Sequence, residues 1–478
     1  MEKGKRALWC VVIAAAVLAL CSKCSPLYGF NDWMDANIFF TMGKSMMQGK
    51  VLYRDVFDHK GPLLYLVYGI GTLLDATGFA GVFAVEIGAF AAFLSLGLST
   101  AERLLCKPLH PAWAAVPAAA IAASRAFSHG GSAEELLLPL LAAALYGLLV
   151  QVQNPRPMPL RQVFCHGLLA GCALWLKYTV LGFYLAWVLV LAAVYWHRGL
   201  RRQLAQSCGV YLGGMVLATL PWVVYFGLHG ALGDWFTAYF YDNLFLYAGE
   251  RGGLAALARH LWWAVRDSLP AAGLLALFLA WAFASHRRAA AASVAALAAG
   301  LALTSLMGGY LVYYGLVLAV FAPLGLAPLA ALALPGRMPA LARRAMPWGA
   351  LAAAAVWCAL LSPNRALRGR DAQTLPQLRF ARTIAADPGD GLLNYGTLDG
   401  GFYTASGLLP PCRYFCVTNM PLEGQWEEQN TLLENARVSY IVALVDDLGV
   451  RFPGYTCIDQ CSYDGGEGPV TWYLYRRQ

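Results

Sequence analysis

The sequence predicts a polytopic α-helical membrane protein that ends in a small α/β domain. Of its 478 residues, 59% are hydrophobic and 13% are charged, whereas a soluble domain carries about 25% charged residues. Apolar runs recur from Ala7 to Leu361, and several reach the roughly 20 residues that a helix needs to cross a bilayer. After Pro363 the sequence changes to short alternating segments separated by Gly and Pro, a pattern typical of strands and turns.

The positive charges follow the positive-inside rule for membrane proteins. Lys and Arg gather in short clusters between apolar runs, namely "MEKGKR", "NPRPMPLR", "HRGLRRQ", "SHRR" and "GRMPALARR". With the N-terminus inside, about eleven spans place nearly every cluster inside and the carboxylate-rich loops outside. The net charge of +8 is therefore explained by topology, and we expect no nucleic-acid partner.

The spans are expected in a definite order. The first, Ala7–Cys24, is interpreted as a retained span because no signal-cleavage site followed by a soluble domain is evident. An outer segment follows, in which Asp35–Met47 has the spacing of an amphipathic helix on the membrane surface. "GPLLYLVYGIGTLL" is either an interfacial or re-entrant helix or a further span. The remaining spans are expected at 81–104, 112–127, 136–152, on either side of Lys177, at 208–226 and 269–285, on either side of "GGYLVYYG", and after "GRMPALARR".

The chain is thus expected to divide into a membrane domain, 1–362, and an outer α/β domain, 363–478. In the second domain "RVSYIVALVDD" and "VTWYLYRRQ" read as strands and "QWEEQNTLLENA" as a short helix. No group of residues in this domain has the make-up of a catalytic site, so we expect it to bind the acceptor or to cap the site.

The outer domain also holds two Cys-x3-Cys pairs among the twelve cysteines of the chain. An exported domain permits disulfides, so we expect disulfide bonds among Cys412, Cys416, Cys457 and Cys461. Which cysteine bonds to which cannot be read from the sequence. A zinc site is the alternative, but no histidine is adjacent.

The candidate site is the first outer loop, 25–62. The thirteen residues "YRDVFDHKGPLLY" carry two aspartates, an arginine, a histidine and a lysine. Lys60 directly precedes Gly-Pro and a hydrophobic helix. A second acidic pair, Glu134 and Glu135, begins the fourth span on the same face. Ionisable groups at membrane depth are costly and usually mark a site. Lys177 and Arg125 are therefore further candidates for the same site. The alternative is that both side chains extend to the membrane interface without a function.

A carboxylate and cations at a membrane interface suit one reaction in particular. Lys or Arg would bind the phosphate of a lipid substrate and stabilise the charge that develops on it as it leaves. A carboxylate would take the proton of an attacking hydroxyl as a general base. This is glycosyl transfer from a polyprenyl-phosphate sugar.

The same residues resemble a known family, the GT-C class of membrane glycosyltransferases. The likeness is to the bacterial branch related to protein O-mannosyltransferases and lipid A aminoarabinose transferases. That branch shows an early acidic residue, an aromatic-rich helix, a Gly and a Tyr-x-Asp…Lys-(Gly/Pro)-Pro element. The corresponding residues are Asp35, Phe39, Gly49, Tyr53–Asp55 and His59–Pro62.

The resemblance implies a role for each matching residue. Asp35 corresponds to the catalytic acidic residue, with Asp32 as the alternative, and Lys60 corresponds to the phosphate-binding lysine. "GGSAEELLLPL" resembles the Gly-Asn-x-x-Glu-Glu element, so the second acidic residue is Glu134 or Glu135. "DWFTAYFYDNLFLYAG" resembles a later outer loop. The further residues expected to bind substrate are Tyr53, Arg54, Asp58, His59, Lys177 and Asn243, with Tyr247 beside Asn243.

The sequence also departs from the family pattern. Relatives often have a His-Tyr pair where this chain has Tyr313–Tyr314, and the Asp-Glu dipeptide of the mannosyltransferases is Asp35–Ala36. The donor sugar, a hexose or a pentose, and a divalent cation held by Asp35 with Glu134 or Glu135 are therefore left open. The acceptor is a protein, a lipid or a cell-wall polymer. The resemblance implies a multi-pass protein of the bacterial cytoplasmic membrane, with the active site and the C-terminal domain on its outer face.

Two other classes of protein share part of this pattern. A flippase or transporter of lipid-linked glycans would carry charges deep within several spans and often an internal repeat, and neither is evident. A glycan polymerase or ligase would more typically have its large outer loop late in the chain. A purely structural membrane protein would not need the mixed charges of the first loop.

Overall fold

The structure is a computed structural model that describes residues 3–247, 252–332, 339–387, 389–466 and 468–478. The chain forms two compact units. The first unit comprises Met1–Ser22, Glu86–Pro221 and Glu250–Arg365, and the second comprises Lys23–Val85, Trp222–Gly249 and Ala366–Gln478. The second unit therefore unites the first outer loop, a later outer segment and the C-terminal residues. The division into domains 1–362 and 363–478 stays a prediction.

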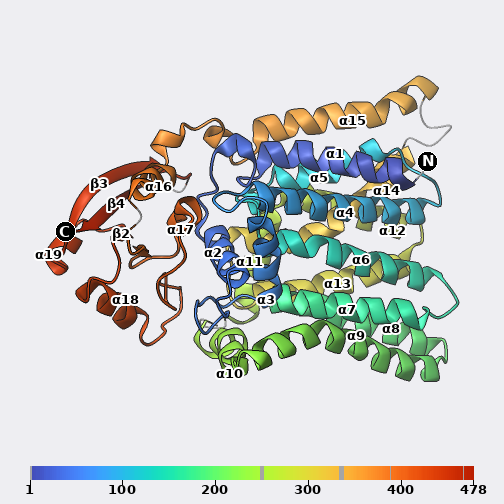
Figure 1. Cartoon of the computed structure of the whole chain (residues 1–478). Coiled ribbons are helices and arrows are strands. Elements are labelled where there is room, and N and C mark those ends of the chain that lie inside the picture. Colours follow the sequence, from blue (N-terminus) through green and yellow to red (C-terminus); the bar gives the residue numbers. More distant parts are fainter. Residues whose placement is uncertain (1–2, 248–251, 333–338, 388, 467) are drawn as a thin grey trace. The chain divides into compact units, whose positions relative to one another are not determined.

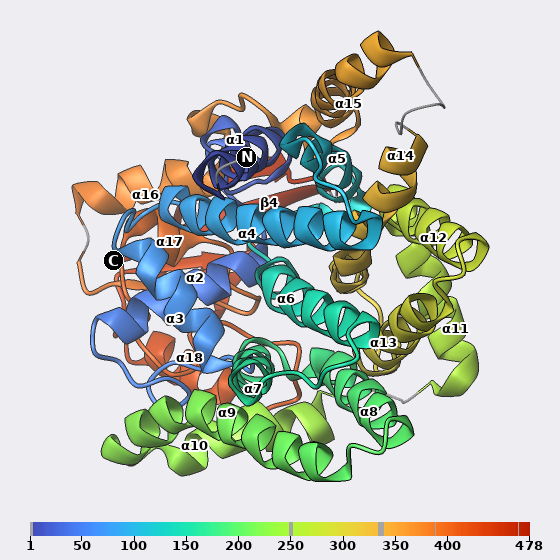
Figure 2. The same ribbon diagram turned by 90° about the vertical axis from the view of Figure 1, so that its right-hand side faces the viewer.

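The first unit consists of apolar helices, most of which run side by side (Figure 1, Figure 2). Apolar residues all round these helices, rather than on a single stripe, are what a membrane environment allows. The helices, some of which extend into the second unit, are α1 (Lys3–Cys21), α4 (Ala80–Leu105), α5 (Ala115–Ala122), α6 (Ala133–Gln153), α7 (Leu160–Leu176), α8 (Leu181–His197), α9 (Arg201–Leu228), α11 (Gly253–Asp267), α12 (Leu269–Ala284), α13 (Arg288–Leu306), the 3-10 helix η6 (Val312–Gly325), α14 (Leu326–Leu332) and α15 (Ala340–Leu361).

The expected multi-pass architecture is confirmed, but the expected number of spans is not. Within the described residues eight helices are long and apolar enough to cross a membrane, or nine if α11 and α12, which meet at 101°, form one broken span. Two of the eleven expected spans correspond to Pro111–Ala122 and Leu160–Leu176, which are shorter than the roughly 20 residues required. "GPLLYLVYGIGTLL" contains another short helix, Pro62–Thr72.

A close backbone contact joins α8 to α13 in the first unit. A Cβ atom on Gly182 would lie 2.1 Å from the carbonyl oxygen of Gly300, so both helices need glycine here. Small residues let membrane helices approach in this way. The Gly182 N–H also donates to Thr304 Oγ1 at 3.2 Å. This contact fixes the beginning of α8, immediately after Lys177.

Two short helices form one half of the second unit. They are α2 (Met34–Met47) and α3 (Pro62–Thr72). They cross at Gly43, where a Cβ atom would lie 2.5 Å from backbone atoms of Tyr65 and Gly69. The amphipathic helix expected at Asp35–Met47 is therefore present. It is not a surface helix, however, because every residue from Ala36 to Ser45 is buried.

A four-stranded sheet forms the other half of the second unit, and the expected C-terminal α/β fold is confirmed. The strands are ordered β1-β2-β4-β3, with β1 parallel to β2 and the other pairs antiparallel. Apolar residues such as Ile441 and its partner Tyr475 fill the core. The elements are the strands β1 (Leu392–Asn394), β2 (Tyr440–Ala443), β3 (Tyr455–Asp464) and β4 (Pro469–Arg477), the helices α10 (Leu232–Phe236), α16 (Pro376–Ala386), α17 (Phe402–Ser406), α18 (Gln425–Glu434) and α19 (Leu448–Arg451), and the π-helix η5 (Thr237–Leu246).

The cysteines differ from expectation. All twelve lie within the described residues and are free thiols, so the disulfides expected among Cys412, Cys416, Cys457 and Cys461 are not formed in this structure. Cys457 and Cys461 are both on β3, and four residues of strand span about 13 Å, well beyond the roughly 7 Å limit between Cα atoms of a disulfide. Burial raises the pKa of Cys412 to about 12, so its thiol stays protonated.

Candidate active site

The loop that begins at Tyr53 is closed on itself by backbone and side-chain hydrogen bonds. The Tyr53 N–H donates to the Val56 carbonyl at 2.8 Å, and the Tyr53 hydroxyl donates to the Lys60 carbonyl at 2.7 Å. Tyr53 has a φ of 67°, which is uncommon for a residue other than glycine. Its fully buried ring, packed against Tyr65 and Phe226, holds this conformation and so fixes both ends of the loop.

Three consecutive side chains of this loop form a line of polar contacts. Asp58 Oδ1 lies 3.2 Å from His59 Nδ1, and His59 Nε2 lies 2.6 Å from Lys60 Nζ. The Tyr65 hydroxyl donates to Asp58 Oδ2 at 2.7 Å and accepts from the Lys60 N–H at 2.8 Å. Because an ammonium group only donates, His59 Nε2 must accept, which places the ring proton on Nδ1 beside Asp58.

The charges of this group follow from burial and proximity. Burial, followed by the positive charge of Lys60, lowers the pKa of His59, and these effects outweigh the opposing effects of Asp58 and Asp35. Burial alone would raise the pKa of Asp58, but His59, Lys60 and the Tyr65 hydroxyl hold it well below its usual range. At neutral pH the group thus contains an ionised Asp58 and a neutral His59 that accepts from Lys60.

The segment 222–249 supplies two residues to this group. Asn243, on the π-helix η5, is buried and donates through Nδ2 to the His59 carbonyl at 2.8 Å. The Tyr247 ring lies 4.6 Å from the His59 ring, and Lys60 Nζ lies 5.6 Å from the Tyr247 ring centroid, within range of a cation–π interaction. Asn243 therefore holds the loop in place, while Tyr247 packs against its charged end.

The structure separates the two candidate aspartates of the first outer loop. Asp35 lies in the first turn of α2, half-buried, and its charge is the last of several effects on the pKa of His59. Asp32 instead pairs with Lys23, with Oδ1 2.8 Å from Nζ.

Arg54 stands apart from the residues around Lys60. It is exposed, pairs with the adjacent Asp55 and donates to the His229 carbonyl at 2.8 Å. Of the residues predicted in the second unit, Tyr53, Asp58, His59, Lys60 and Asn243 come together, and Arg54 points elsewhere.

A second polar group lies in the first unit. Lys177, between α7 and α8, forms a buried ion pair with Glu134 at the start of α6. Its Nζ lies 4.0 Å from the ring centroid of Tyr314 and 5.7 Å from that of Tyr313. The two tyrosines that replace the family's His-Tyr pair thus contact the lysine. The Lys177 side chain therefore does not extend to the membrane interface, because its charge is paired within the protein.

Sequence reasoning missed one acidic residue of the first unit, Glu86 on α4. The N–H of Gly131 donates to Glu86 Oε1 at 2.6 Å and to Glu135 Oε2 at 3.1 Å, and Ser22 Oγ donates to Glu86 at 3.0 Å. Both carboxyl groups are buried and accept from the same backbone N–H. The available signal was a single carboxylate inside the apolar run "GVFAVEIGAF", which is costly at membrane depth.

No ligand set for a metal gathers in the part of the chain that the structure describes. There, no group of three or more His, Cys, Asp or Glu side chains lies close enough together to hold an ion. The polar residues around Lys60 instead bring an ammonium group, a histidine and the Asp58 carboxylate together.

The whole chain is similar in structure to ArnT from Cupriavidus metallidurans. The structure of ArnT bound to undecaprenyl phosphate matches with a TM-score of 0.63 over 99% of this chain and 98% of ArnT, at 14% identity. The apo structure of ArnT matches with a TM-score of 0.65 over 98% of both chains, at 15% identity. The chain has the ArnT fold.

A second solved structure with this fold is more distant. Arabinofuranosyltransferase AftD from Mycobacteria matches with a TM-score of 0.51 and 15% identity over 100% of this chain, but over only 40% of AftD. No protein-family model and no curated protein sequence matches the chain. The fold implied by the GT-C resemblance is confirmed by these structures, and the roles of the individual residues stay predictions.

Proposed function

We propose that the chain is a membrane glycosyltransferase that moves a hexose or pentose from a polyprenyl-phosphate donor to a hydroxyl of an extracytoplasmic acceptor. The ArnT fold, shared along the full chain with a protein whose structure contains undecaprenyl phosphate, supports this class of donor. The distribution of basic clusters supports an outer-face reaction. The acceptor is a protein, a lipid or a cell-wall polymer.

The observation that carries the proposal is the line of contacts from Asp58 through His59 to Lys60 in the second unit, with Asp35 near enough for its charge to act on His59. Lys60 supplies an ammonium group 2.6 Å from His59, and Asp35 supplies a carboxylate whose charge reaches the same ring. A phosphate-binding cation and a carboxylate that can accept a proton are the two groups that the transfer needs.

The reaction then proceeds by displacement at the anomeric carbon. The acceptor hydroxyl attacks that carbon while Asp35 takes its proton as general base. The bond between the anomeric carbon and the phosphate oxygen breaks, and its electron pair leaves with the polyprenyl phosphate. Lys60 stabilises the charge that grows on this leaving group, because preorganised donors aimed at developing charge lower the barrier most.

The remaining residues orient these two groups. His59 accepts an ammonium hydrogen of Lys60 through Nε2, and its Nδ1 proton lies beside Asp58. Asp32 is less suited to the role of base because its charge is already paired with Lys23. In the first unit, Lys177 pairs with Glu134, and we assign this pair to substrate binding without a part in proton transfer.

The test uses purified full-length protein in lipid and a radiolabelled panel of polyprenyl-phosphate sugars. Wild type should release or transfer sugar, and Asp35→Asn should lose at least about a hundredfold in kcat while still binding the lipid. Lys60→Met should lose both rate and donor affinity. Asp32→Asn is the matched control in the same loop and should retain most activity.

Two outcomes would contradict the proposal. Movement of the labelled lipid across the bilayer without sugar release would identify a flippase. Turnover that survives Asp35→Asn but is lost in Asp32→Asn would retain the transferase and move the base to Asp32.

A further inference from the structure

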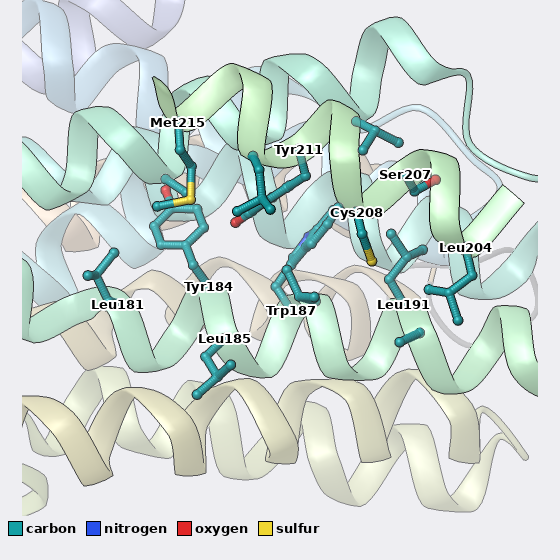
Figure 3. A pocket seen from close by; sticks show the side chains of 15 residues that line it. Leu181, Tyr184, Leu185, Trp187, Leu191, Leu204, Ser207, Cys208, Tyr211 and Met215 are labelled. Carbon is teal, nitrogen blue, oxygen red and sulfur yellow. The ribbon is translucent and has the colours of Figure 1, made fainter. Parts of the chain in front are cut away.

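A long apolar pocket lies between α7, α8 and α9 in the first unit. Its cavity volume is about 380 Å³. Figure 3 shows side chains of α8 and α9 along its length, with Leu181 and Met215 at one end and Leu191 and Leu204 at the other. Fifteen residues line it, nearly all of them apolar in their contact surface. A cavity of this kind accepts a hydrocarbon chain.

The pocket has the dimensions of one leaflet. Leu181 and Leu191 are ten residues apart on α8, so the pocket runs for about 15 Å along the helix, which is half of the roughly 30 Å hydrocarbon core. At about 30 Å³ for each water-sized group, its volume holds on the order of a dozen methylenes. An acyl chain of about this length would fill the pocket.

The pocket is open to the bilayer. Leu185 and Leu212, which line it, are 61% and 59% exposed, and Cys208 is also exposed. These side chains lie on membrane-spanning helices, so their exposed surface faces lipid. A lipid can enter from the side without any rearrangement of the helices.

The end of the pocket at Leu204 adjoins a strongly positive turn. Leu204 is one helical turn from Arg201, and Arg202 is exposed beside it. Arg201 lies 4.8 Å from the Trp196 ring, which positions its guanidinium. Arg198, in the same turn, donates to backbone carbonyls at the end of α6 and so draws that helix end toward the turn.

These charges have no acidic counterpart in the sequence around them. The stretch 136–233 contains no Asp or Glu, although it forms the whole of α7, α8 and α9. Clusters of arginine at the ends of membrane helices attract anionic headgroups. The combination of an uncompensated cationic turn and an apolar pocket one leaflet deep is complementary to a single class of molecule.

We propose that this pocket binds one acyl chain of an anionic phospholipid, with the phosphate held by Arg201 and Arg202. Ser207, buried on the pocket wall two turns or so into α9, faces the region of the chain's ester group. The site takes a resident lipid, not the sugar donor, and it does not depend on the proposed transfer reaction.

The first test measures binding by native mass spectrometry of the delipidated full-length protein. Phosphatidylglycerol and phosphatidylcholine with the same acyl chains are titrated separately. Wild type should retain phosphatidylglycerol at least about tenfold more tightly, since each basic residue near an anionic headgroup adds measurably to affinity. The double variant Arg201→Gln/Arg202→Gln should lose this preference.

The matched control is Arg287→Gln/Arg288→Gln, at another turn between two helices of the first unit. Arg287 also lies over a tryptophan ring, 5.3 Å from Trp281, so the two turns present similar local chemistry. The control should retain the preference of the wild type. An equal loss in both double variants, or equal retention of the two phospholipids by the wild type, would overturn the proposal.

The second test asks whether the chain lies in the pocket. N-ethylmaleimide labelling is followed separately at Cys208, which lines the pocket, and at Cys165, which is exposed on α7 but does not line it. Phosphatidylglycerol should slow labelling of Cys208 several-fold and leave Cys165 unchanged. Protection of Cys208 by polyprenyl phosphate but not by phosphatidylglycerol would assign the pocket to the isoprenoid tail of a donor and refute the proposal.

Discussion

His59 offers the sharpest test of how the Lys60 group works, because its ring makes two separable contacts. Its Nε2 lies 2.6 Å from Lys60 Nζ, and its face lies 4.6 Å from the Tyr247 ring. His59→Phe keeps an aromatic ring against Tyr247 and removes the acceptor. His59→Gln removes the ring and keeps an acceptor oxygen. The pair of variants therefore separates hydrogen bonding from packing.

The expected size of the effect follows from the bond that is lost. A hydrogen bond to a charged group contributes about 1.5–3 kcal/mol, and each 1.4 kcal/mol is about a factor of ten in rate. If Lys60 stabilises the leaving phosphate, His59→Phe should lower kcat/KM roughly 10- to 100-fold. His59→Gln should stay within a few-fold of wild type.

The assay is steady-state transfer from the polyprenyl-phosphate sugar that proves active, measured between pH 5 and 8. Burial and Lys60 lower the pKa of His59, so the wild-type ring is neutral at pH 7 and gains a proton only in acid. Protonation removes the acceptor and places a second positive charge beside Lys60. Wild-type kcat/KM should therefore fall as the pH drops through this pKa, and His59→Gln should lack that fall. A His59→Phe enzyme as active as wild type, beside an inactive His59→Gln, would refute the hydrogen-bond argument.

Three further predictions concern stability and the second polar group. Burial raises the pKa of Asp399 to about 6, so the native state retains a proton that the unfolded state releases from about pH 4. Thermal unfolding in detergent should therefore show a stability that falls as the pH rises from 4 to 6. Asp399→Asn should remove this pH dependence and raise the stability by about 2 kcal/mol at pH 7. Gly43→Ala should destabilise by about 3 kcal/mol in the same assay, because its Cβ would meet backbone atoms at 2.5 Å, whereas Gly88→Ala, which meets nothing within 4 Å, should be neutral. Lys177→Met should destabilise the protein by about 3–5 kcal/mol because it leaves the buried Glu134 unpaired. The double variant with Glu134→Gln should recover most of that stability. An unchanged melting temperature in Lys177→Met would show that the ion pair does not contribute to stability.

The parts of the fold that depend on local pattern could be predicted from the sequence. The helix at Asp35–Met47 was found because Ile38, Phe39, Met42 and Met46 repeat at helical spacing. Its burial on all sides could not be predicted, since it depends on the backbone contact at Gly43 and on chain segments hundreds of residues away. Eleven spans were expected because an apolar run does not reveal how long its helix is, as at Pro111–Ala122 and Leu160–Leu176.

The candidate site, too, was only partly predictable from the sequence. Lys60 was predicted because it stands in a short, densely charged loop, and Asp35 because the family resemblance places the catalytic acidic residue there. The contacts from Asp58 through His59 to Lys60 were not predicted, because the side chains of three adjacent residues in a regular strand or helix would point in different directions. Tyr65 was read only as part of an apolar helix, and its hydroxyl joins the site through the turn at Gly61–Pro62. The cysteine spacing suggested disulfides, but a strand holds Cys457 and Cys461 too far apart to bond to each other.

The closure of the loop by Tyr53 has a consequence for how the site can vary during evolution. Because its hydroxyl bonds the carbonyl of Lys60, the number of residues between positions 53 and 60 is fixed even where their identity is free. Arg54, exposed and bonded outward, is open to substitution. A single residue inserted or deleted between positions 53 and 60 would move the Lys60 carbonyl away from the Tyr53 hydroxyl. Homologous loops should therefore diverge in composition while conserving their length.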